Sequence, residues 1–81
     1  MITDFEVSTL KEGDLLQFSA TQRNGLPNDA LVFHLVLQVI DLYAGRRPPG
    51  AGVAVSTLSS ECSAITGMVI VPGQLGWTLL R

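Results

Sequence analysis

Residues 30–42 read Ala-Leu-Val-Phe-His-Leu-Val-Leu-Gln-Val-Ile-Asp-Leu, and this stretch decides the fold. Its β-branched and other apolar residues are typical of a β-strand. Side chains on a strand alternate between its two faces. One face would carry Leu31, Phe33, Leu35, Leu37 and Val39, and the other would carry Val32, His34, Val36, Gln38 and Ile40. Both faces are therefore largely apolar.

A strand with two apolar faces needs two partners. An antiparallel sheet in a small protein commonly keeps one face in water. A chain of 81 residues buries only about 60% of its unfolded surface, so it has few residues with which to cover both faces. The odd-numbered face is uninterrupted, and we predict that it packs on the core. We predict that the even-numbered face (Val32, His34, Val36, Gln38 and Ile40) is buried only when a second chain is present.

The composition supports self-association. Hydrophobic residues make up 47% of the chain and charged residues only 15%, against a usual charged fraction of about 25%. Ten of the twelve charged residues precede Pro48, so the C-terminal part has little charge to keep it in solution. We expect a homo-oligomer, with a further protein partner as a second possibility. The net charge of −2 argues against nucleic acid as a partner.

The apolar surplus does not indicate a membrane protein. The uncharged stretch Cys62–Leu80 is broken by Pro72, Gly73, Gln74 and Gly76 into pieces too short to span a bilayer. The N-terminus carries acidic residues and no basic start, unlike a secretory signal, so we expect a cytoplasmic protein.

Cys62 is the only cysteine, which excludes an intramolecular disulfide, and we expect it to be a small apolar residue rather than a reactive thiol.

Turn residues divide the chain into short segments that favour strands. The loops are predicted at Gln22–Asp29 and at the proline- and glycine-rich Gly45–Gly52. Thr9–Glu12 has the spacing of a capping box, but Gly13 limits it to one helical turn. Gly67 suggests a bulge or bend. Strands are predicted at 14–21, 30–42, 53–58, 64–71 and 76–80, with Phe5–Val7 as a possible sixth. Residues 1–81 then form one all-β domain, a small open barrel of five or six mostly antiparallel strands.

Two segments resemble a known type of fold. Residues 10–18, Leu-Lys-Glu-Gly-Asp-Leu-Leu-Gln-Phe, and residues 36–41, Val-Leu-Gln-Val-Ile-Asp, are similar to the first strands of small Src-homology-3-like (SH3-like) barrels of bacteriophages and mobile genetic elements. The resemblance covers about half the chain. It implies an SH3-like fold and a class of non-enzymatic modules, and it carries over no functional residue.

The sequence contains no arrangement typical of an enzyme. His34 is the only histidine, and no motif joins it to Cys62, Asp29 or Asp41. We expect His34 to be a buried or interfacial residue bonded to a neighbour; a metal site across a symmetry axis, a pH switch and a catalytic base are the alternatives. We predict no enzymatic activity, no cofactor and no bound metal.

Four residues are candidates for contacting a ligand or partner. Arg46 and Arg47 could hold a phosphate or carboxylate, but the loop lacks the Gly-Lys-Ser/Thr of a P-loop, and a solvated loop is the simpler interpretation. Tyr43 flanks this loop and combines stacking with a hydroxyl group. Trp77 is expected either to close the core or to contact a partner.

These observations lead to one function and one alternative. The leading prediction is a non-enzymatic structural or protein-interaction module that self-associates and is encoded by a mobile genetic element. The alternative is a small-molecule or anion-binding protein whose pocket lies at a subunit interface.

Overall fold

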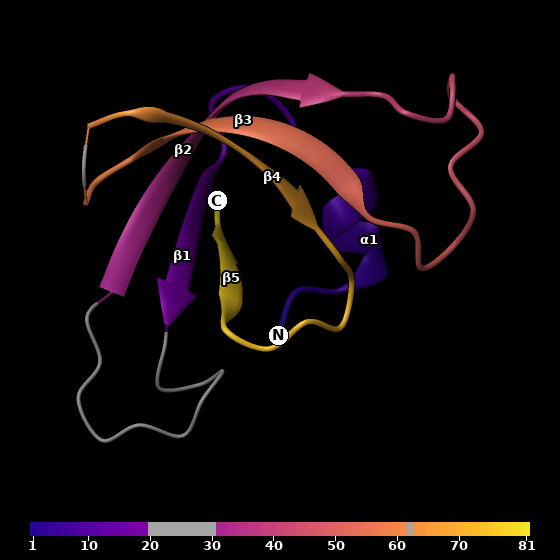
Figure 1. The fold of residues 1–81 in the computed structure, drawn as a ribbon. Helices are drawn as coiled ribbons and strands as arrows, with labels where there is room; N and C mark the ends of the chain where they lie inside the picture. Colours follow the sequence, from indigo (N-terminus) through magenta and orange to yellow (C-terminus); the bar gives the residue numbers. More distant parts are fainter. Residues whose placement is uncertain (20–30, 62) are drawn as a thin grey trace.

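The computed structural model describes residues 1–19, 31–61 and 63–81. One short helix precedes a sheet of five strands (Figure 1). The predicted loop at Gln22–Asp29, Ala20 and Cys62 lie outside the described residues. The elements are α1 (Asp4–Ser8), β1 (Leu15–Ser19), β2 (Leu31–Ile40), β3 (Val53–Ser59), β4 (Ile65–Ile70) and β5 (Trp77–Leu80).

The helix α1 forms where the sequence predicted a possible strand at Phe5–Val7, and that prediction was wrong. Thr3 caps the helix: its hydroxyl accepts the Glu6 backbone N–H, and the Glu6 carboxylate accepts the Thr3 N–H. This reciprocal pair is a capping box, and it satisfies two amides that the first turn leaves unpaired. The same Thr-x-x-Glu spacing at Thr9 forms no helix, because Gly13 turns the chain towards β1.

The strands form one antiparallel sheet in the order β4-β3-β2-β1-β5. The last strand thus lies beside the first, while β4 lies at the opposite edge. The sheet curves strongly over its interior but does not close into a barrel (Figure 1). The all-β prediction is confirmed, and each of the five main strands lies within two residues of its predicted bounds.

A bulge in β2 changes which residues face the core. Val36 pairs with Thr57 and Gln38 with the adjacent Ser56, so Leu37 is an extra residue in β2. An extra residue reverses the alternation of side chains. Before the bulge the even-numbered residues face inward, and after it Val39 does. No register shift occurs at Gly67, where the sequence suggested one.

The predicted roles of the two faces of β2 are therefore corrected. Val36 is 1% exposed and His34 is 8% exposed within a single chain, so neither needs a second chain for burial. Of the same predicted set, Val32 is half-buried, whereas Gln38 and Ile40 are exposed. Leu31 and Leu35, expected in the core, are 48% and 39% exposed. The odd-numbered residues ahead of the bulge thus form the outer face.

The core lies beneath the concave side of the sheet. Inward-facing residues of all five strands meet there with the segment around α1, and the prediction that Leu16 and Phe18 point inward is confirmed. Apolar burial of this kind contributes about 25 cal/mol per Å² removed from water. The buried apolar residues are Ile2, Val7, Leu10, Leu16, Val36, Val55, Ile70 and Trp77.

Candidate functional site

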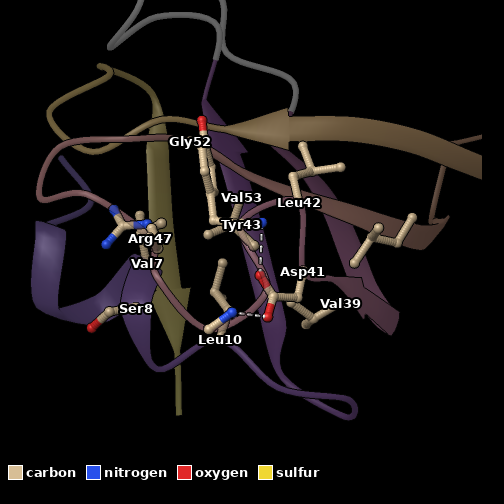
Figure 2. A pocket seen from close by; sticks show the side chains of 12 residues that line it. Val7, Ser8, Leu10, Val39, Asp41, Leu42, Tyr43, Arg47, Gly52 and Val53 are labelled. Atoms are coloured by element: carbon tan, nitrogen blue, oxygen red, sulfur yellow. Dashed lines mark hydrogen bonds between the residues drawn. The ribbon is translucent and has the colours of Figure 1, made fainter.

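A pocket lies between α1, the loop after β2 and the start of β3 (Figure 2). Its volume is about 330 Å³. Val7 and Leu10 form one wall and Val39 and Val53 another, and all four also pack in or against the core. The remaining lining residues are Ser8, Ile40, Asp41, Leu42, Tyr43, Gly45, Arg47 and Gly52. The pocket is thus mainly apolar and belongs to a single chain.

Arg47 lines the pocket on the α1 side, next to Val7 (Figure 2). Its Nη2 lies 2.7 Å from the Asp4 carboxylate, and its Nε and Nη2 both donate to the Ala51 carbonyl. The hydrogen bonds from Arg47 and from the Gly50 N–H lower the pKa of Asp4, so this carboxylate stays ionised. The guanidinium is therefore already neutralised and fixed in place.

Asp41 is the second carboxylate at the pocket. Its two oxygens accept the backbone N–H groups of Tyr43 and Gly45. This is the local turn that aspartate forms with amides two to four residues onward. Asp41 thus shapes the loop. Its negative charge lies at the pocket, with both carboxylate oxygens already hydrogen-bonded.

The four predicted ligand candidates do not form one site. Tyr43 and Arg47 both line the pocket, whereas Arg46 is exposed and does not line it. Trp77 lies in the core, with its ring 5.0 Å from that of Phe18. Sequence reasoning missed Asp4, the partner of Arg47, since the two are joined only by the fold.

His34 lies beside Trp77, with ring centroids 5.4 Å apart. Its Nδ1 is 3.1 Å from the Thr57 hydroxyl, which is fully buried. Burial lowers the pKa of His34, and the more distant Glu61 carboxylate opposes this effect. His34 is thus a neutral, hydrogen-bonded core residue of one chain. Within the described ranges, no three His, Cys, Asp or Glu side chains lie close enough to hold a metal ion.

The outer face of the sheet carries a continuous line of aliphatic side chains. Strand pairing places Leu15 opposite both Leu80 and Leu35, Leu35 opposite Leu58, and Leu58 opposite Ile65. Paired residues in an antiparallel sheet share a face. The line therefore crosses all five strands, and we call it the outer apolar row: Leu80, Leu15, Leu35, Leu58 and Ile65.

The outer apolar row combines a shallow hollow with a protruding side chain. Leu15, Leu35 and Leu58 line the hollow together with Phe33 and nearby serines. Ile65, at the β4 end of the row, is 71% exposed. Apolar surface arranged in this way is a marker of protein contact.

None of the helices in the described part of the chain is long and apolar enough to cross a membrane. Comparison with protein-family models, curated proteins and solved structures finds no match for this chain.

Proposed function

We propose that this protein is a non-enzymatic interaction module that self-associates through the outer apolar row. The observation that carries the proposal is the alignment of five aliphatic side chains across the whole sheet on its solvent face. Four of them, Leu80, Leu35, Leu58 and Ile65, are between 37% and 71% exposed. Covering them removes apolar surface from water, which favours association.

A second copy of the chain is the occupant that this surface fits best. The hollow lined by Leu15, Leu35 and Leu58 and the protruding Ile65 lie on the same face. In a two-fold dimer each copy can place its Ile65 against the hollow of the other, because a two-fold contact uses one surface twice. No residue of the row carries a charge, so two copies meet without electrostatic repulsion.

The size of the face sets the expected strength of association. Five strands spaced about 4.8 Å apart and about six residues long cover roughly 24 by 20 Å. Two such faces in contact would bury at most about 1,200 Å² of surface in total, which is the low end for specific interfaces. We therefore expect a reversible dimer with a dissociation constant in the micromolar range.

Sedimentation velocity over a concentration series tests the proposal. Leu35→Lys and Ile65→Lys are expected to be folded monomers, because a buried unpaired lysine at the contact is costly. Leu75→Lys is the matched control, since Leu75 is exposed but lies outside the row. It is expected to associate like the wild type. A wild type that stays monomeric up to millimolar concentration, or row variants that still dimerise, would contradict self-association through this face.

An SH3-like fold, with the barrel left open, remains part of the proposal. Its support is the antiparallel order with β5 beside β1, which bends the sheet around one core, together with the resemblance of residues 10–18 and 36–41. Origin in a mobile genetic element is proposed on the resemblance. A small-molecule site remains the second function, supported by the pocket at Tyr43 and Arg47.

A further inference from the structure

The pocket beside α1 has the size and the lining of a small-molecule site. Its volume of about 330 Å³ falls at the lower end of the range of about 300–1,000 Å³ usual for such sites. Val7 and Leu10 are buried core residues and hold one wall rigid. At the other side Leu42 and Tyr43 are exposed, so the pocket has an apolar floor and opens to solvent.

Charge decides which ligands fit this pocket. Arg47, the one cationic residue among the described lining residues, is paired with Asp4, and Asp41 adds a negative charge that none of these residues balances. An anion would therefore meet no free positive charge and would approach Asp41. A cation would find both Asp41 oxygens already accepting backbone N–H groups. A charged ligand of either sign would lose its hydration without gaining a free opposite charge. A neutral ligand avoids this cost.

Two of the lining residues each carry a hydrogen-bond donor that is not yet paired. Within the part of the chain that the structure describes, neither Arg47 Nη1 nor the Tyr43 hydroxyl has a hydrogen-bond partner. Both donors can bond an oxygen acceptor. The three other bonds of Arg47 hold its guanidinium still, which lowers the entropy lost when a ligand binds.

We propose that this pocket binds a neutral, mainly aliphatic small molecule that carries one hydroxyl or carbonyl oxygen. The aliphatic part lies against Val7, Leu10, Val39 and Val53, and the oxygen accepts a hydrogen bond from Arg47 or Tyr43. The site is complete within one chain. It is therefore independent of the dimer proposed above.

The test compares 1-octanol with octanoate, which share a chain length and differ in charge, by titration of the backbone amide NMR signals. Octanol is expected to give saturable shifts confined to the amides lining the pocket, and octanoate to bind at least about tenfold more weakly, or ~1.4 kcal/mol. The absence of saturable shifts with octanol, or tighter binding of octanoate, would overturn the proposal.

Four variants locate the site. Ser8→Trp places a large side chain at the pocket and is expected to abolish the octanol shifts, whereas Arg46→Met, outside the pocket, is expected to leave them unchanged. If Ser8→Trp does not fold, Leu42→Ala replaces it and is expected to weaken octanol binding several-fold. Leu35→Lys, the monomeric row variant, is expected to bind octanol like the wild type. Loss of binding in Leu35→Lys would place the site at a subunit interface and overturn a single-chain pocket.

Discussion

His34 shows what one buried titratable side chain does to stability. It is 8% exposed, with its Nδ1 beside the Thr57 hydroxyl and its ring beside Trp77. Protonation adds a second ring N–H and a positive charge in an apolar core, and no carboxylate of the described residues is in hydrogen-bond contact with the ring. The neutral form is therefore the one that the fold accommodates.

The pH dependence of unfolding follows from this burial. The pKa of His34 in the folded chain is lowered from its usual 6.5, mainly by burial. The unfolded chain therefore binds the proton more readily, and stability from the neutral ring is present above about pH 6.5 and lost as the pH falls below it. We expect the melting temperature to drop by several degrees between pH 7.5 and pH 5, measured by circular dichroism.

His34→Gln keeps a polar side chain but removes the titration, so its melting temperature is expected to be nearly constant over the same interval. Asp4 and Asp14 do not obscure this result, since both have pKa values lowered from 3.8. An equal drop in wild type and His34→Gln would show that another group controls the stability there.

At the scale of elements, the start of β3 packs unusually closely on β4. A Cβ at Gly52 would lie 2.6 Å from Val69 Cγ1 and 3.3 Å from the Ile70 carbonyl oxygen. Valine is stiff about its first side-chain torsion, so the methyl group cannot move away freely. Gly52→Ala is expected to destabilise the fold by about 1–3 kcal/mol through this crowding.

Gly67 in β4 offers the matched control for Gly52. No heavy atom lies within 4 Å of a Cβ added there, and its φ is not positive. Gly67→Ala is expected to be neutral or to stabilise by up to about 1 kcal/mol, because alanine restricts the unfolded chain. Urea titration of both variants measures the two changes, and similar midpoints would contradict close packing at Gly52.

The strands were predictable from sequence, whereas the two faces of β2 were not. Strand positions follow from local composition and from the turn residues that bound each segment. The bulge at Leu37 depends on which residues of β3 pair with β2, and no single alternating pattern fits both sides of it. The predicted pattern therefore places Val39 correctly and the residues before the bulge on the wrong faces. The pocket likewise joins residues far apart in the chain, as Asp4 and Arg47 show. The one missed local signal was the Thr3–Glu6 capping box.

At the scale of the whole molecule, the strand order brings the two ends of the sequence together. β5 lies beside β1, and Arg81 reaches back to the segment before β1. Its Nη1 donates to the Thr9 hydroxyl, and its Nη2 donates to the Thr9 carbonyl and lies 3.0 Å from the Asp14 carboxylate. Asp14 also accepts the Lys11 N–H and so holds the turn at Gly13.

Arg81 therefore links the last strand to the turn that begins the first. Burial alone would raise the pKa of Asp14, but the hydrogen bonds from Arg81 and from the Lys11 N–H, with the charges of both residues, lower it overall. This carboxylate contributes stability above its unfolded pKa, and the contribution is lost as the pH falls through the lower folded value. Arg81→Gln leaves the buried carboxylate without its cation.

We expect Arg81→Gln to lower the free energy of unfolding at pH 7 by about 1–3 kcal/mol, or about 4–8 °C in melting temperature for each kcal/mol. Arg46→Gln is the matched control, because Arg46 is exposed and makes no ion pair within the described part of the chain. It is expected to change stability by less than about 0.5 kcal/mol. The difference between Arg81→Gln and the wild type should shrink as the pH falls through the lowered pKa of Asp14, since protonation removes the negative charge that Arg81 pairs with. If Arg81→Gln and Arg46→Gln are equally stable at pH 7, the hydrogen bonds between β1 and β5 hold these strands together without Arg81.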